Sequence, residues 1–339
     1  MQKHRRALLS VLVGSLVVMA QAQDGGEVLR TSAAVDQIIP RSARIEKLAD
    51  GFGFLEGPIW VHSGYLLFSD IPRNVILKWK PDGKVSVFLS KSGFAGKVVR
   101  PIPRVIPMDH LTDYLIGSNG LTLDHEGRLI ICEHGNRRVE RLERDGRRII
   151  LADRFEGKRL NSPNDIVVKS DGSIYFTDPP YGLPKMDQDP QKELPFNGVY
   201  RIAGEKLELL TRDMSAPNGL AFTPDEKYLY IDDSVKKNIL RYEVQPNGTL
   251  ANARVFLDMS KTGIEGVPDG LKVDTRGNVY CAGPDGIWVI SPEGTKLGVI
   301  KPPEVPANMN WGDDDAKTLY MTARTGLYSI RLNIPGIRP

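Results

Sequence analysis

The chain has 339 residues, and its 33 Gly and 24 Pro indicate many short strands separated by turns rather than long helices. Lys and Arg number 45 against 42 Asp and Glu, a balance that gives no support to a nucleic-acid partner. Two cysteines are too few for a structural zinc site. A disulfide is the alternative, but Cys132 and Cys281 occupy nearly equivalent places in two distant stretches of the chain, so we expect both to be buried as small apolar side chains.

The first 22 residues predict a cleavable signal peptide. A basic start precedes an apolar run at residues 7–19, and Ala20-Gln21-Ala22 is typical of a cleavage site. A retained membrane anchor is the alternative, but the run falls short of the roughly 18 residues that a membrane span needs. We therefore expect a mature chain that begins near Gln23, is periplasmic or secreted, and has no membrane segment after cleavage.

From residue 44 onward, similar stretches of about 40 to 65 residues follow one another, a period typical of propeller blades. Each opens on a short polar motif, continues as an apolar strand, and reaches a second strand about ten positions later. The openings are Glu56-Gly57, Asn119-Gly120, Asn164-Asp165, Asn218-Gly219, Asp269-Gly270 and a last one around Met309. Four short strands in each of six repeats predict an all-β fold, a six-bladed β-propeller over residues 44–333.

The two ends of the chain predict how the propeller closes. The last repeat has three strands before the chain stops, and residues 44–49 resemble the outer strands of other repeats. We expect this N-terminal strand to close the last blade and to remove an exposed edge. Residues 23–43 are interpreted as a polar leader and residues 334–339 as a C-terminal tail, so deleting residues 44–49 should destabilise the fold far more than deleting 23–40. Two Pro-rich insertions, residues 91–118 and 179–196, predict covering loops or lids.

One position of the openings carries a side-chain oxygen in five of the six repeats. The six residues at this position are Glu56, Asn119, Asn164, Asn218, Asp269 and Met309. Asn-Gly and Asp-Gly are common turn dipeptides, so a purely structural role is the alternative. The inner strands of a propeller all begin on one face, however, and carboxylate and amide oxygens converging on its axis suit Ca²⁺, Mg²⁺ or Mn²⁺.

These motifs resemble those of the SMP-30/gluconolactonase/luciferin-regenerating-enzyme-like family of calcium-dependent six-bladed propellers, and most of all its exported bacterial gluconolactonases. The resemblance covers nearly all of residues 44–332 and includes Leu55-Glu56-Gly57-Pro58, Ser118-Asn119-Gly120-Leu121, Ser162-Pro163-Asn164-Asp165, Pro217-Asn218-Gly219-Leu220 and Pro268-Asp269-Gly270. It implies a divalent cation, Ca²⁺ with Mg²⁺, Mn²⁺ or Zn²⁺ as alternatives, bound by Glu56, Asn164, Asn218 and Asp269. It also implies that Asp269 is the catalytic base. The animal regucalcin branch has an arginine where this chain has Ser162.

Four residues are candidates for substrate binding, namely Asn119, His134, Asp165 and Tyr181. The loops that follow the second strands open on the same face as the ligand column, which would bring His134 and Tyr181 to the mouth of the site. A neutral imidazole there could bond a substrate hydroxyl or shuttle a proton, although a structural histidine fits equally well. Tyr181 packing within its loop is the alternative to substrate contact. Asp165 occupies a place that Gly takes in other openings and could orient Asn164 or meet the substrate.

The resemblance implies an enzyme that hydrolyses a small-molecule sugar lactone, with the cation polarising the carbonyl for attack by water. Because a carboxylate bound to a cation has a lowered pKa, Asp269 is either the base or only a ligand. Two alternatives are kept: metal-dependent hydrolysis of phosphotriesters or aryl esters, and a non-catalytic binding propeller whose metal is structural. The sequence leaves open the natural lactone, the physiological metal and the oligomeric state.

Overall fold

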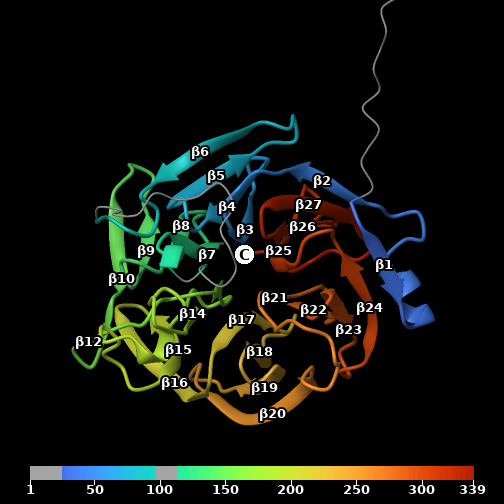
Figure 1. Ribbon diagram of the computed structural model, residues 1–339. Helices are drawn as coiled ribbons and strands as arrows, with labels where there is room; N and C mark the ends of the chain where they lie inside the picture. Colours follow the sequence, from blue (N-terminus) through green and yellow to red (C-terminus); the bar gives the residue numbers. More distant parts are fainter. Residues whose placement is uncertain (1–24, 97–110, 112) are drawn as a thin grey trace, which may run out of the picture.

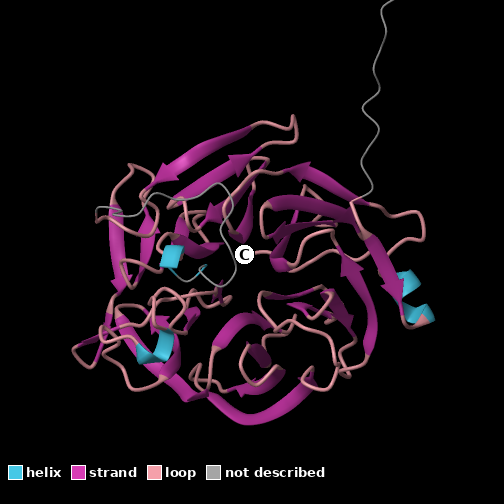
Figure 2. Ribbon diagram, in the orientation of Figure 1, coloured by secondary structure: helices cyan, strands magenta, loops and turns pink. Residues whose placement is uncertain are grey.

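Six β-sheets surround a common axis in the computed structural model, which describes residues 25–96, 111 and 113–339 (Figure 1). Strands and the turns between them make up nearly all of the fold, and the helical turns are few and short (Figure 2). Each sheet is antiparallel, and the strand next to the blade's polar opening motif lies innermost. The prediction of a six-bladed propeller is therefore confirmed.

The strands of the first three blades are β3 (Leu55–Val61), β4 (Tyr65–Asp70), β5 (Val75–Trp79) and β6 (Val85–Ser90); β7 (Ser118–Leu123), β8 (Leu129–Glu133), β9 (Arg138–Leu142) and β10 (Arg148–Ala152); and β13 (Ile166–Val168), β14 (Ile174–Asp178), β15 (Asn197–Ala203) and β16 (Lys206–Met214). Blade four has β17 (Pro217–Phe222), β18 (Tyr228–Asp233), β19 (Asn238–Val244) and β20 (Leu250–Asp258). Blade five has β21 (Leu271–Val273), β22 (Val279–Gly283), β23 (Gly286–Ile290) and β24 (Lys296–Lys301), and blade six has β25 (Pro306–Gly312), β26 (Thr318–Ala323) and β27 (Gly326–Arg331). A small hairpin, β11 (Arg154–Phe155) and β12 (Lys158–Arg159), links blades two and three.

The innermost hairpin of blade three shows why these short segments become strands. Ile166 pairs with Phe176 and Val168 with Ile174, so apolar side chains stand opposite one another across the ladder. Gly172 makes the turn between the strands at φ +84°, a conformation that favours glycine.

The N-terminal strand β2 (Ile45–Ala49) closes the last blade. It pairs antiparallel with β27, with Ile45 opposite Ile330, so the outer position of blade six is filled from the other end of the chain. This confirms the predicted closure, and the free edge of β27 is removed.

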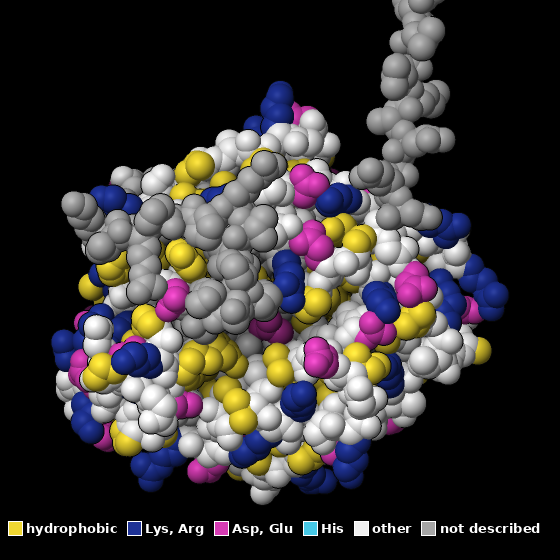
Figure 3. Space-filling view, viewed as in Figure 1, with side chains coloured by type: hydrophobic (Ala, Val, Ile, Leu, Met, Phe, Trp, Pro, Cys, Tyr) yellow, Lys and Arg dark blue, Asp and Glu magenta, His cyan; other side chains and the backbone are white. Residues whose placement is uncertain are grey.

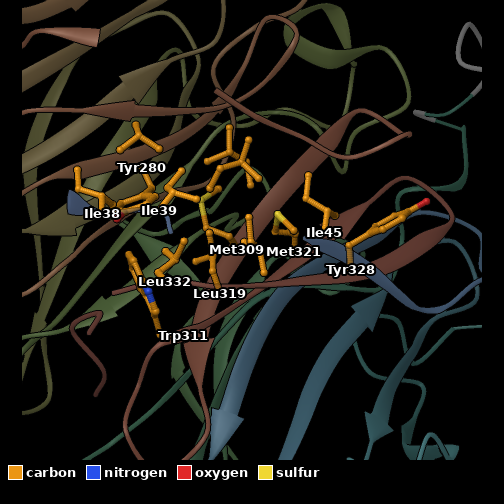
Figure 4. Close-up of a cluster of buried hydrophobic side chains, with 14 of the residues drawn as sticks. Ile38, Ile39, Ile45, Tyr280, Met309, Trp311, Leu319, Met321, Tyr328 and Leu332 are labelled. Carbon is orange, nitrogen blue, oxygen red and sulfur yellow. The ribbon is translucent and has the colours of Figure 1, made fainter. Parts of the chain in front are cut away.

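The leader differs from the interpretation as a segment outside the propeller. β1 (Glu27–Arg30) pairs with β24 as a fifth strand of blade five, and a 3₁₀ helix at Ala33–Gln37 follows. Val35 and Ile39 are fully buried in an apolar cluster with Met309 and Trp311 from blade six (Figure 4). Residues 27–39 therefore belong to the fold, because Val35, Ile38 and Ile39 reach the core and the partly buried Val28 and Leu29 pack against it.

The C-terminal tail also packs on the propeller. Gly336 forms a β-bridge with Asp274, and the Ile337 N–H donates to the Val273 carbonyl at 3.1 Å. Ile334 is buried, and the chain ends at the centre of the ring in projection (Figure 1). The tail lines a cavity of about 410 Å³ at the ends of the inner strands remote from their openings.

The two insertions are described unequally. Most of the first, residues 97–110 and 112, lies outside the described residues, so its prediction as a covering loop stays a prediction. The second includes a 3₁₀ helix at Met186–Gln188 and buries Leu183 and Leu194. Cys132 and Cys281 are buried and unpaired as predicted. In the described part of the chain, no helix has the length and apolarity to cross a membrane.

Candidate active site

The openings of neighbouring blades meet at the axis through a row of side-chain amides. Asn119 Nδ2 donates to Asn164 Oδ1 at 2.6 Å, and Asn164 Nδ2 donates to Asn218 Oδ1 at 2.5 Å. Asn218 Nδ2 continues the row to Ser234 Oγ at 3.2 Å. The structure thus brings together side chains from blades two, three and four that the sequence placed in one column.

Glycine follows the polar residue in several openings because the next blade leaves no room for a side chain. The N–H groups of Gly120 and Gly219 donate to the Asn164 and Asp269 carbonyls at 2.7 and 3.0 Å. A Cβ at either glycine would stand 2.5 Å or less from the same carbonyl oxygen. These dipeptides are therefore contacts between blades, and neither glycine needs the left-handed conformation of a turn.

Two hydroxyl groups on second strands add to these contacts. Ser69 Oγ donates to the Asn119 carbonyl and Thr177 Oγ1 to the Asn218 carbonyl, each at 2.8 Å. The backbone of these two openings is consequently held by hydrogen bonds from the neighbouring blade as well as by bonds within its own blade.

In blade six the residue at the axis is Asn308, one position before the predicted Met309. Met309 is fully buried in the core instead, because β25 changes register between Pro306 and Asn308. Asn308 packs against Gly270 and hydrogen-bonds Glu56. The sixth opening therefore also supplies a side-chain amide, which sequence reasoning missed.

Four carboxyl groups face this region, from Glu56, Asp165, Asp232 and Asp269. Burial, followed by the charges of Asp269 and Asp165, raises the pKa of Glu56 well above its usual value. Burial is also the main cause that raises the pKa of Asp269 to about 7, with the charge of Asp165 adding to it. The pKa of Asp232 is raised by burial and then by Asp269. Among the described residues, Asp165 is the one member of the four that forms an ion pair, with the Lys272 ammonium at 3.0 Å.

His134 lies beneath the amide row and has no exposed surface. Its Nε2 is 3.1 Å from Asn119 Nδ2 and 3.3 Å from Asn164 Oδ1. Burial lowers the pKa of His134 to about 4, so the imidazole is neutral at pH 7 and its Nε2 can accept the Asn119 amide hydrogen. With Nε2 accepting from Asn119, the imidazole supports the row through the Asn119 amide and offers no accessible surface to a substrate.

Tyr181 reaches the site from the blade-three insertion. Its ring packs near Leu111 and Leu115, and its hydroxyl hydrogen-bonds Ser234. Burial raises the pKa of the Tyr181 hydroxyl, and the charge of Asp269 contributes. The tyrosine therefore combines loop packing with a polar group beside the axis.

Ser162 and Asp178 hold the loop that carries Asn164. Asp178 accepts the Asn161 and Ser162 N–H groups at 2.7 Å each, and Ser162 Oγ donates to the Pro179 carbonyl at 2.6 Å while accepting from the Gly182 N–H at 2.9 Å. Ser162, which stands where the animal regucalcin branch has an arginine, thus links the loop that carries Asn164 to the blade-three insertion.

The oxygen-rich centre fits a hard divalent cation. Asn119 Oδ1 and both carboxylate oxygens of Asp232 are buried without a hydrogen-bond partner among the described residues, as expected where acceptors outnumber donors. Asp269 is partly exposed. No group of three or more His, Cys, Asp or Glu residues within the described ranges is arranged to bind a metal, so a cation at the axis requires the amide oxygens as well.

A six-bladed propeller with polar openings at its axis defines the class, and the comparisons define the family. The family model described as the SMP-30/gluconolactonase/LRE-like region matches residues 54–325, and this chain belongs to that family. It is 36% identical over 317 residues to a gluconolactonase of Zymomonas mobilis, an alignment covering 90% of this chain and 86% of that protein. The recognition made from the sequence motifs is confirmed.

Solved structures agree with this assignment. A gluconolactonase of Xanthomonas campestris superposes with a TM-score of 0.77 at 31% identity, covering 93% of this chain and 99% of that one. A luciferin-regenerating enzyme superposes with a TM-score of 0.69 at 18% identity, covering 88% and 98%, a likeness that concerns the fold alone.

Proposed function

We propose that this chain is a hydrolase that opens the ring of a sugar lactone with the help of a divalent cation, Ca²⁺ in the first place, at the openings of the six blades. The observation that carries the proposal is the convergence of carboxylate and amide oxygens from all six openings on one axis. Relatives above 30% identity over most of their length are named gluconolactonases, which supports the substrate class.

Glu56, Asn164, Asn218 and Asp269 are the residues that would hold the cation. Two carboxylates and two amide oxygens form a hard donor set with two negative charges, which favours Ca²⁺ over softer metals. When bound, such a cation supplies Lewis acidity for the lactone carbonyl.

In this proposal, Asp269 takes the proton of the attacking water on one of its carboxylate oxygens. Its pKa of about 7 lies in the range that suits a general base at neutral pH. Contact with a cation lowers the pKa of a carboxylate and weakens it as a base, so the two roles of Asp269 must be separated by experiment.

In this proposal, Asn119 and Tyr181 orient the lactone. Asn119 Oδ1 has no partner among the described residues and can accept a substrate hydroxyl, and the Tyr181 hydroxyl lies beside Ser234. His134 and Asp165 are buried against the amide row and Lys272. We assign them to holding Asn119 and Asn164 in place.

A lactonase screen under chelator control tests the proposal. Acid release from glucono-1,5-lactone and other aldonolactones is followed with EDTA and after addition of Ca²⁺, Mg²⁺, Mn²⁺ or Zn²⁺, with an aryl ester and an organophosphate as comparison substrates. We expect lactone turnover that EDTA abolishes and Ca²⁺ restores. Turnover indifferent to EDTA, or present only on the organophosphate, contradicts it.

The variant Asp269→Asn separates the base from the ligand. The amide keeps an oxygen for the cation but cannot accept the proton, so we expect kcat to fall by about 100-fold or more with Ca²⁺ affinity reduced to a smaller extent. Full turnover with intact Ca²⁺ affinity would remove the base role.

We also propose export to the periplasm or beyond, with cleavage after Ala22. The proposal rests on the basic start, apolar run and small-residue site of residues 1–22, which lie outside the described residues. N-terminal sequencing of the protein from its native cell tests it, and an intact Met1 would contradict it.

A further inference from the structure

Lys272 on β21 forms an ion pair with Asp165 of blade three. Its Nζ lies 3.0 Å from Asp165 Oδ2 and 3.0 Å from the Leu271 carbonyl oxygen. The Lys272 side chain is 16% exposed and that of Asp165 is 3% exposed. The pair spans the axis from the blade that carries Asp269 to the blade that carries Asn164.

The lysine is unusual for its position in the repeat. The residues three places after the six axial side chains are Ile59, Thr122, Val167, Ala221, Lys272 and Trp311. Lys272 alone among these six is ionisable. Thr122, Val167, Ala221 and Lys272 line the cavity of about 410 Å³ at the far ends of the inner strands, so the lysine extends from that end toward the ring of openings.

Charge explains what the ammonium does there. Glu56, Asp165, Asp232 and Asp269 are four acidic groups near one point, whereas a divalent cation balances two charges. Asp165 is joined to Asn164 by one peptide bond, and one of its oxygens accepts its neighbour's N–H at 2.9 Å while the other meets Lys272. Without the ammonium, the second oxygen would be a buried charge without a partner, which is strongly unfavourable, and an adjacent divalent cation would attract it.

We propose that Lys272 is a positioning residue that holds Asp165 away from the cation, so that the ring keeps an open position for the lactone. The inference rests on the proposed function, because it assigns a role toward the cation of that site. It predicts that loss of the lysine charge tightens cation binding while it slows turnover, since Asp165 would then take the place of the substrate.

Calcium titration calorimetry and lactonase kinetics on four variants test this. Lys272→Met is expected to lower the Ca²⁺ Kd by about tenfold and to lower kcat. Asp165→Asn is expected to raise the Kd, because the ammonium is left without its counter-charge. The double variant K272M/D165N should return the Kd toward the wild-type value, and Lys272→Arg should keep both Kd and kcat close to it.

Thr122→Val, at the corresponding place in blade two, is the matched control and should leave the Kd unchanged. If Lys272 has only a structural role, Lys272→Met should bind Ca²⁺ more weakly than the wild type, and adding Asp165→Asn should not restore the affinity. This result overturns the proposal.

If Lys272→Met does not fold, the comparison of D165N with the double variant decides, since the proposal requires the double variant to bind Ca²⁺ more tightly than D165N. Wild-type protein that binds no Ca²⁺ would overturn the proposed function itself, whereas wild type that binds Ca²⁺ beside an unaffected Lys272→Met would overturn this inference alone.

Discussion

Gly120 stands where blade two meets blade three, and its missing side chain lets the two openings touch. We predict that Gly120→Ala lowers the free energy of unfolding by about 3 kcal/mol, the upper range for overpacking, because the new Cβ would be 2.5 Å from the Asn164 carbonyl oxygen. Lactonase activity should fall with it, since Asn164 must move. Gly64→Ala is the control: Gly64 has φ +88° and nothing within 4 Å of a Cβ, so backbone strain should cost about 1 kcal/mol and spare activity. Urea unfolding measures both, and equal losses would contradict the contact.

The sequence predicted which residues head the inner strands, but it could not distinguish a turn glycine from a contact glycine. The atoms that exclude a side chain at Gly120 belong to another blade, 44 positions later in the chain. For the same reason the sequence could not show that His134 is covered from all sides. Local pattern identifies a polar residue near an opening, whereas burial is decided by neighbours remote in sequence.

His134 makes the metal-free protein sensitive to acid. Its folded pKa of about 4 lies below the unfolded value of 6.5, so the unfolded chain binds the proton more readily. Stability from this group is complete above pH 6.5 and is lost as the pH falls toward 4, by up to about 3 kcal/mol. We predict that urea unfolding in EDTA between pH 7.5 and 4.5 shows this loss for the wild type and that His134→Gln lacks that part of the slope. Identical slopes would show that the imidazole is protonated in the folded state.

Among the elements, β1 and the turn after it contribute stability that the sequence did not predict. Val35, Ile38 and Ile39 lie in a 3₁₀ helix and the turn that follows it, a stretch too short to show a helical or strand period. The strand at residues 44–49 was easier to recognise, because it resembles the outer strands of other blades and the last blade lacked one. The repeat pattern of the sequence therefore identifies the strands of the propeller blades. It does not identify an added element, such as β1 and its 3₁₀ helix, that has no counterpart in the other repeats.

We accordingly predict that removing residues 25–40 from the chain destabilises it to an extent comparable with removing 44–49. The first deletion exposes the cluster around Trp311 and Met309 (Figure 4) and uncovers the edge of β24. A milder test is Val35→Ala, which should cost about 1 to 2 kcal/mol through lost burial, against Val87→Ala at a 56% exposed position, which should cost less than about 0.5 kcal/mol. Thermal unfolding that is unchanged in the 25–40 deletion would restore the view of this segment as a leader.

At the scale of the whole molecule, the ring closes through contacts between the ends of the chain. β2 completes blade six by pairing with β27, β1 adds a strand to blade five, and the tail forms a bridge to Asp274 of blade five. Both ends of the chain therefore contact the last two blades or one of them. Charged side chains of both signs are spread over the face in Figure 3, consistent with the near-balance of acidic and basic residues in the sequence. Repeats predicted the ring, and the register change in β25 explains why the sixth axial residue was placed one position late.

The C-terminal tail provides a last test, because it separates stability from chemistry. Gly336 lies within van der Waals contact of Trp311, and Ile334 is buried with the core of blades five and six. The proposed cation site at the openings lies at the other end of the inner strands. We predict that truncation after Asn333 lowers the free energy of unfolding by about 3 kcal/mol, the cost of losing one buried isoleucine and uncovering a tryptophan, while Ca²⁺ affinity measured well below the unfolding temperature stays within about twofold of the wild type. Removing only Arg338 and Pro339 should leave both quantities nearly unchanged, since these residues bury little of the core. A loss of Ca²⁺ affinity in the longer truncation would mean that the two ends of the inner strands are coupled, and the independence predicted here would be wrong.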